Sequence, residues 1–88
     1  MKLKYRFAEM QIADDMIAVP VGNGVQKFHG AFRINGVTKD IMDLLKEETT
    51  EKAIIESLLG QYDASRDEVA ESVRLVISTL RAEGLLVD

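Results

Sequence analysis

The stretch Phe28-His29-Gly30-Ala31-Phe32-Arg33-Ile34-Asn35 decides the fold, because it predicts a short strand that runs directly into a helix. Period-two alternation places Phe28, Phe32 and Ile34 on one face of this strand, which we expect to face the core. Asn35 carries a side-chain oxygen suited to capping the helix that follows. Almost everything before this stretch predicts strands, and everything after it predicts helices.

Two further strands are predicted upstream. Tyr5 to Ala13 alternates loosely and ends at the turn-prone Asp14-Asp15, and Met16–Val21 is rich in β-branched residues. Pro20 cannot donate to a ladder, so we place it near a strand end or with its nitrogen pointing away from a partner. Short connections favour antiparallel neighbours, so these strands and Phe28–Ile34 predict a three-stranded meander.

Three helices follow the strands. The first runs from Val37 to Lys46, and the second is capped by Thr49 or Thr50. The third begins at a capping box, because Ser65 and Glu68 lie three residues apart. Gly84 is typical of the residue just after a helix end. The apolar stripe of the third helix comprises Val69, Val73, Val76, Ile77 and Leu80. Strands followed by helices in blocks indicate an α+β fold, here a single domain over residues 1–88.

Composition excludes several classes of protein. The chain has 88 residues, a net charge of -4 and 47% hydrophobic residues, which is typical of one folded globular domain. Its apolar runs are far shorter than the roughly 20 residues that cross a bilayer. Acidic residues interrupt any signal-peptide core after Lys2 and Lys4, so we expect a cytoplasmic protein with no membrane partner.

The sequence contains few side chains that could bind a metal or a cofactor. The chain has no cysteine, which excludes disulfides, thiolate nucleophiles and cysteine-ligated zinc or iron–sulfur sites. It has one histidine, His29, so a cluster of histidines around a metal is also excluded. Gly22-Asn23-Gly24 lacks the continuation of a phosphate loop and is typical of a turn instead. We therefore expect no cofactor, no metal and no catalysis.

The order and spacing of several short motifs resemble one protein family across nearly the whole chain. The chain is similar to the pyrroloquinoline-quinone synthesis protein D family, whose members are also called peptide-recognition elements of ribosomal peptide-modifying systems. The motifs are Ile17-Ala18-Val19-Pro20-Val21-Gly22, Phe28-x-Gly30 with Ile34-Asn35, Ile41-x-x-Leu44-Leu45-Lys46, Tyr62-Asp63-Ala64-Ser65 and Leu80-x-x-x-Gly84-Leu85-Leu86.

This resemblance implies a winged-helix-like domain that captures the leader of a precursor peptide and delivers it to a modifying enzyme, typically a radical-SAM protein. The leader would add as a strand beside Phe28–Ile34 and pack against the third helix, a mode in which main-chain hydrogen bonds supply affinity. Carried onto this chain, the binding residues are His29, Gly30, Ala31, Phe32, Arg33 and Ile34 of the strand and Arg66, Val69, Ala70, Val73 and Arg74 of the helix. We expect Val69 and Val73 to leave one helix edge exposed as a groove, and Arg66 and Arg74 to meet acidic residues of the leader.

One departure from the family concerns the connection between the first two helices. Members of the quinone pathway usually carry an acidic residue and Gly there, where this chain has Lys46-Glu47-Glu48-Thr49. The pathway therefore stays open between pyrroloquinoline quinone and another modified peptide. A homodimer also stays open, because the loop Gly22–Lys27 is long enough for copies to exchange elements.

Two other classes of function compete with peptide binding. Three helices and a small sheet can also form a winged-helix nucleic-acid-binding or transcription-associated domain. Residues 66–83 carry three arginines and four acids, whereas a helix that faces phosphates should be basic, so we expect no nucleic-acid partner. A pure interaction or oligomerisation module remains the third alternative, since an exposed strand edge can pair with itself.

Overall fold

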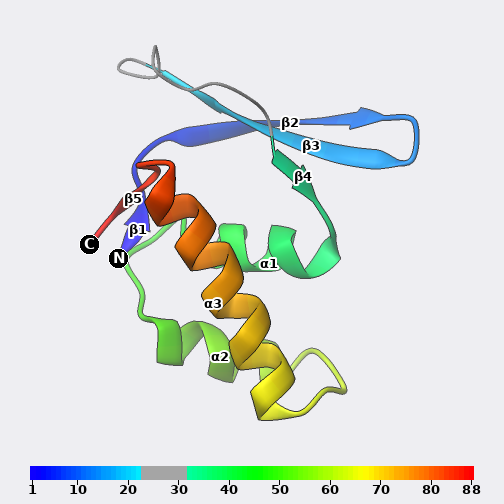
Figure 1. Ribbon diagram of the computed structural model, residues 1–88, viewed down its shortest axis with the longest axis vertical. Helices are drawn as coiled ribbons and strands as arrows, with labels where there is room; N and C mark the ends of the chain where they lie inside the picture. The colour runs from blue at the N-terminus through cyan, green and yellow to red at the C-terminus, as the bar shows by residue number, and fades with distance from the viewer. Residues whose placement is uncertain (23–31) are drawn as a thin grey trace.

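A computed structural model describes residues 1–22 and 32–88 of the chain. Three strands form an antiparallel sheet in the order β2-β3-β4, and three helices follow (Figure 1). The predicted α+β class, with a three-stranded antiparallel sheet followed by three helices, is confirmed. The elements are β1 Lys2–Leu3, β2 Arg6–Ile12, β3 Asp15–Val21, β4 Phe32–Ile34, α1 Gly36–Leu44, α2 Glu51–Leu59, α3 Arg66–Ala82 and β5 Leu86–Val87.

The sequence did not predict the two-stranded sheet that joins the chain ends. β1 pairs antiparallel with β5, so both termini lie side by side at one edge of the molecule (Figure 1). The backbone N–H of Leu3 donates to the Leu45 carbonyl at 2.8 Å, and that of Lys4 donates to the Leu85 carbonyl at 2.8 Å. Strands of two residues are too short to show any periodicity, so only these tertiary contacts define them.

The hairpin of β2 and β3 is in register from Arg6↔Val21 to Ile12↔Asp15. Ala13 forms its turn with a positive φ of 53°, a conformation that residues other than Gly, Asn and Asp rarely adopt. β4 pairs with β3 from Met16↔Ile34 to Ala18↔Phe32. Pro20 lies one residue before the end of β3, near a strand end as expected for a residue without an N–H, and is in register with Phe7 of β2. The far end of the hairpin projects past the helices (Figure 1).

The core lies between the inner face of the sheet and the three helices. Ile34 is buried and Phe32 is half-buried, so these two residues face the core as predicted. The Phe32 ring lies 6.3 Å from the Phe7 ring, centroid to centroid. Buried hydrophobic side chains form one cluster: Ala18, Ile34, Ile41, Met42, Leu45, Ile54, Ile55, Leu58, Val69, Val73, Ile77, Leu80 and Leu85.

Each helix begins at a residue whose side chain caps it. Asn35 Oδ1 accepts from the Thr38 N–H at 2.8 Å, and Thr50, not Thr49, caps α2. Ser65 Oγ accepts from the Glu68 N–H at 3.2 Å, and Glu68 Oε1 accepts from the Ser65 N–H at 3.2 Å. This confirms the predicted capping box of α3.

The C-terminal end of α3 is closed by the backbone at Gly84. Gly84 has a φ of +72°, in the left-handed region that glycine tolerates best. The N–H of Leu85 then donates back to the Leu80 carbonyl at 2.8 Å, and that of Gly84 donates to the Arg81 carbonyl at 3.0 Å. This is the Schellman pattern of hydrogen bonds, and it turns the buried Leu85 into the core.

Candidate peptide groove

An apolar pocket of about 180 Å³ lies where β4, α1 and the C-terminal half of α3 meet. Met42 and Leu80 are buried and close its floor, whereas Leu75 is 63% exposed at its rim. An exposed leucine beside an apolar hollow is an incomplete hydrophobic contact that a ligand could complete. The lining residues are Phe32, Arg33, Thr38, Met42, Leu75, Val76, Thr79 and Leu80.

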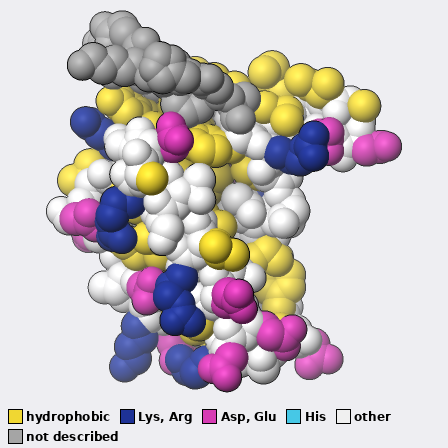
Figure 2. Space-filling view, in the orientation of Figure 1, with side chains coloured by type: hydrophobic (Ala, Val, Ile, Leu, Met, Phe, Trp, Pro, Cys, Tyr) yellow, Lys and Arg dark blue, Asp and Glu magenta, His cyan; other side chains and the backbone are white. Residues whose placement is uncertain are grey.

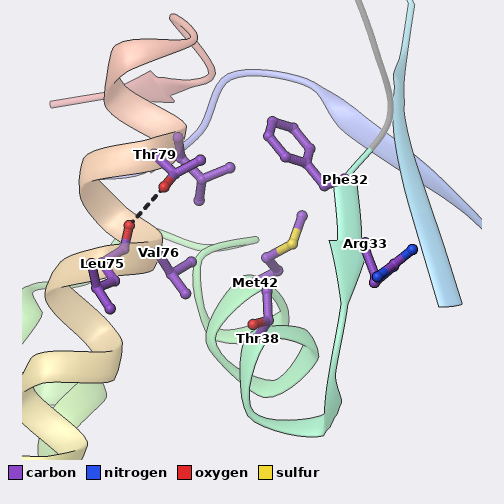
Figure 3. A pocket seen from close by; sticks show the side chains of 8 residues that line it. Phe32, Arg33, Thr38, Met42, Leu75, Val76 and Thr79 are labelled. Atoms are coloured by element: carbon purple, nitrogen blue, oxygen red, sulfur yellow. Dashed lines mark hydrogen bonds between the residues drawn. The ribbon is translucent and has the colours of Figure 1, made fainter. Parts of the chain in front are cut away.

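The close view of the pocket shows α3 on one side, β4 on the other and α1 between them (Figure 3). Met42 rises from α1 into the space between Val76 and Phe32 (Figure 3). The Thr79 hydroxyl donates to the Leu75 carbonyl at 2.9 Å, so this polar group is satisfied within α3 (Figure 3). The surface that the pocket offers to a ligand is therefore mainly hydrocarbon.

Arg33 is the charged residue among those that line the pocket, and its side chain points away from it (Figure 3). Its guanidinium lies 3.5 Å from the Asp15 carboxylate of β3. This ion pair holds the charge on the far side of β4. Burial of apolar surface, rather than charge, would thus dominate the binding of a side chain in the pocket.

β4 is an edge strand of the three-stranded sheet, as the described residues define it. One of its sides pairs with β3, and the other faces the pocket and α3. An edge strand next to a helix can accept an added strand through its main chain while the helix contacts the side chains of that strand. The arrangement is thus suited to an extended peptide.

The helix residues predicted to bind a peptide do not line this pocket. Val69 is 6% exposed and Val73 is 0% exposed, so the prediction that they form an exposed edge is wrong. Both face the core, where α3 packs on α1 and α2. The apolar stripe of α3 predicts both a core face and an exposed edge, but both valines are buried in the core.

Helical geometry explains why the predicted arginines also lie elsewhere. At about 100° per residue, Leu75, Val76 and Thr79 fall on one flank of the buried valine stripe. Arg66, Ala70 and Arg74 fall on the stripe itself or on its opposite flank. Arg66 forms an ion pair with Glu56 of α2, which is consistent with this orientation.

The strand residues divide into two groups. Phe32 and Arg33 line the pocket, and Ile34 is buried at the end of β4. His29, Gly30 and Ala31 lie outside the described residues. Two of the predicted strand residues therefore line the pocket. The residues of α1 and α3 that line it with them were not predicted as site residues.

Leu75 and Thr79 are the main residues that sequence reasoning missed. Leu75 is a large apolar residue outside the i, i+4 stripe, and an isolated leucine there is a weak sign of a contact that the core does not require. Thr79 lies four residues further on, on the same flank. Nothing in the sequence indicates that Met42 of α1 separates them from β4.

A second hollow, of about 490 Å³, lies between the start of β2 and α1. Its lining includes charged residues from both elements. Lys46 Nζ lies 3.1 Å from Asp43 at the end of α1, and Glu9 of β2 lies 3.1 Å from Lys39 Nζ of α1. Because several charged side chains line this hollow, it suits an apolar side chain less well than the pocket beside α3, whose lining contains one charged residue.

The described residues also bear on metal binding and on membrane insertion. Residues 1–22 and 32–88 contain no group of three or more His, Cys, Asp or Glu side chains that could hold a metal ion. Within the same ranges, no helix has both the length and the apolar character needed to cross a membrane.

Comparison with known proteins gives one family and one solved structure. No curated protein matches the chain. The structure described as "TbiB1 in Complex with the TbiA(beta) Leader Peptide" has a TM-score of 0.68, 21% sequence identity and coverage of 100% of both chains, a likeness that shows a shared fold. Residues 21–86 match the family described as Coenzyme PQQ synthesis protein D (PqqD). Because this match covers most of the chain and agrees with the motifs in the sequence, the chain belongs to the Coenzyme PQQ synthesis protein D family.

Proposed function

We propose that this chain binds the leader of a ribosomally made precursor peptide, which adds as a strand along β4 and packs against α3. The observation that carries the proposal is the apolar pocket between edge strand β4 and the C-terminal half of α3, with Leu75 exposed at its rim. In strand addition the main chain supplies affinity and pockets for alternate side chains supply specificity.

The dimensions and chemistry of the pocket define what the leader should carry. Successive side chains of a strand point to opposite faces, so every second residue of the leader would face α3. A pocket of about 180 Å³ lined mainly by hydrocarbon suits one bulky aliphatic or aromatic side chain. We therefore infer that the leader places one large apolar anchor between Met42, Leu75 and Val76.

Similarity to other proteins supports this function independently of the pocket. The structure of similar fold is a complex with a leader peptide, and the family is named for a biosynthetic pathway. We further propose that the chain is not an enzyme but delivers the leader to a modifying enzyme, with the radical-SAM class expected. Among the described residues, the pocket lining offers no carboxylate or imidazole to act as a general base. Pyrroloquinoline quinone and another modified peptide remain alternative products.

The charges of α3 oppose the alternative nucleic-acid function. Arg66 pairs with Glu56, and Arg81 Nη2 lies 2.7 Å from the Asp88 carboxylate. Arginines already neutralised by carboxylates contribute less to phosphate binding, which depends on cationic groups that displace counterions.

The test measures binding of a fluorescent leader peptide by anisotropy. The peptide comes from a short precursor gene beside the gene for this chain or, failing that, from selection of a random displayed library on the folded protein. Leu75→Glu should weaken binding by at least about tenfold, because it places a charge against an apolar anchor. Val87→Glu is the matched control, since Val87 is also an exposed apolar residue but lies on β5.

Two results would count against the proposal. If Leu75→Glu and Val87→Glu both bind like the parent protein, the pocket beside α3 is not the site. If Val87→Glu alone weakens binding, the peptide binds near the chain termini instead. Circular dichroism of each variant checks that the helices are intact.

A further inference from the structure

Met42 of α1 lies between two hollow spaces of the molecule. Among the residues that the structure describes, it is the one that lines both the pocket beside α3 and the hollow between β2 and α1. Thr38, four residues before it, lines the pocket, and Lys46, four residues after it, lines the hollow. Residues four apart share one face of a helix, so Met42 lies on this face at the boundary between the two spaces.

Two aromatic rings mark the same boundary on the side of the sheet. Phe32 lines the pocket, Phe7 lines the hollow, and their ring centroids lie 6.3 Å apart. The side chain of Met42 lies between Phe32 and Val76 and is only 6% exposed (Figure 3). Because protein interiors are close-packed, a ligand that pushes on a buried side chain can move it only into a neighbouring space. For Met42 that space is the hollow of about 490 Å³.

The chemistry of the Met42 side chain suits such a displacement. Methionine is unbranched, and rotation about its side-chain bonds lets it fill spaces of irregular shape. Its thioether also makes favourable contacts with aromatic rings, and Tyr5 and Phe7 line the hollow. A β-branched side chain at the same position would instead be held by the helix in one strongly preferred rotamer. Met42 can therefore turn toward the hollow while the backbone of α1 stays in place.

Shape rather than charge should select the residue that enters the pocket. The charged side chain of Arg33 points away from the pocket (Figure 3). On the face shown in Figure 2, basic and acidic side chains are interspersed over the helices. Burial of apolar surface is non-directional, so the fit of the entering side chain to the available volume decides between apolar residues of different size. A wall that can move then sets the range of sizes that the pocket accepts.

We propose that Met42 is a movable wall that determines which anchor residues of a leader this chain accepts. The inference rests on the proposed function and names the residue that selects among leaders. With a leucine anchor, Met42 keeps its place beside Val76 and closes the pocket of about 180 Å³. With a tryptophan anchor, the Met42 thioether turns toward Tyr5 and Phe7, and the pocket lengthens into the hollow beside β2. The chain therefore accepts leaders with either anchor.

The binding test compares two forms of the fluorescent leader, with Leu or Trp at the position where alanine weakens binding most. The parent protein should bind the two forms within about fivefold of each other. Met42→Ile nearly conserves side-chain volume but fixes the rotamer, so it should raise the preference for the Leu form at least about tenfold. Met16→Ile is the matched control and should keep the preference of the parent, because Met16 also packs against the core but lines neither space. An unchanged preference in Met42→Ile would overturn the movable wall.

Nuclear magnetic resonance on the parent protein with labelled methionine methyl groups gives a second test, which needs no variant. The Met42 methyl group should show nuclear Overhauser effects to Val76 with the Leu form and to the rings of Tyr5 and Phe7 with the Trp form. Contacts to Val76 with both forms would overturn the proposal. Leu75→Glu separates this proposal from the proposed function. If Leu75→Glu binds both forms like the parent, leader binding at the pocket fails; if it weakens both while Met42→Ile leaves the preference unchanged, only the movable wall fails.

Discussion

The two halves of α3 contribute differently to this domain, although both are amphipathic. In the N-terminal half, Arg66–Val73, the valines are buried and Arg66 pairs with Glu56. In the C-terminal half, Leu75–Ala82, Ile77 and Leu80 fill the core while Leu75 is exposed beside β4. An apolar stripe in a sequence thus identifies the face that a helix buries, and the apolar residue beside that stripe is the better guide to a ligand.

The largest expected difference between the two halves is in stability. Val73→Ala removes two buried methyl groups and should cost about 2 kcal/mol, whereas Leu75→Ala should cost less than about 0.5 kcal/mol. Thermal unfolding followed by circular dichroism measures both changes. Equal losses for the two variants would mean that Leu75 belongs to the core, which would remove the distinction between the halves.

Leader affinity should depend more on the C-terminal half of α3 than on the N-terminal half, which is the reverse of the order expected for stability. Leu75→Ala should weaken binding about tenfold, or about 1.4 kcal/mol, because it removes the rim of the pocket. Reversing Arg66 and Arg74 to Glu should change affinity by less than about twofold at low salt, where screening is weakest. Anisotropy titrations at low and high salt compare the parent protein, Leu75→Ala and the variant with both arginines reversed. If the arginine variant binds the leader much more weakly at low salt, and high salt abolishes this difference, the leader binds at the N-terminal half of α3.

The two ends of α3 should contribute similar amounts to stability through different groups. Ser65→Ala removes the N-cap and should cost about 1 kcal/mol, which lowers the melting temperature by several degrees in a domain of this size. Gly84→Ala should also cost about 1 kcal/mol, since alanine disfavours a φ of +72°. Melting curves of the two variants test this, and a Gly84→Ala variant as stable as the parent would show that the end of α3 can rearrange.

The smallest expected effect is the pH dependence of the capping box. The hydrogen bond from the Ser65 backbone N–H lowers the pKa of Glu68 in the folded protein. A carboxyl group with a lowered folded pKa stabilises the fold above its unfolded pKa and loses this contribution as the pH falls through the folded value. Stability should therefore fall between about pH 5 and about pH 3.

Glu68→Gln provides the matched control for this effect. Glutamine can complete the same capping box but does not titrate, so the variant should lose less stability on acidification than the parent. Urea titrations at several pH values measure the difference. The lowered pKa values of Glu56, Asp43 and Asp88 act in both proteins and cancel in the comparison. Identical pH profiles would show that Glu68 makes no contribution through its charge.

Local signals in the sequence were enough to predict most of the fold. Asn35 and the Ser65–Glu68 box cap helices where predicted, and Phe32 and Ile34 face the core. These features depend on neighbours a few residues apart, which a sequence displays directly. The β1–β5 pair depends on contacts between the two chain ends, so no local pattern could reveal it.

Of the residues that line the candidate site, the sequence predicted Phe32 and Arg33 of the strand but none of the residues of α3. Strand addition beside β4 and α3 came from the resemblance to the family, and the site residues remain a proposal. Which flank of α3 faces β4 depends on how the helix is rotated when Val69 and Val73 enter the core. Rotation of a helix is a tertiary property, so the choice between Arg74 and its neighbour Leu75 could not be made from periodicity alone.

The most direct test is to locate the bound leader by nuclear magnetic resonance on methyl-labelled protein. Nuclear Overhauser effects between the leader and the methyl groups of Leu75, Val76 and Met42, together with main-chain contacts to β4, are the result that we predict. Contacts to Ala70, on the opposite flank of α3, or to Met10 of β2 would contradict the account. Either result would show that the leader does not lie between β4 and the C-terminal half of α3.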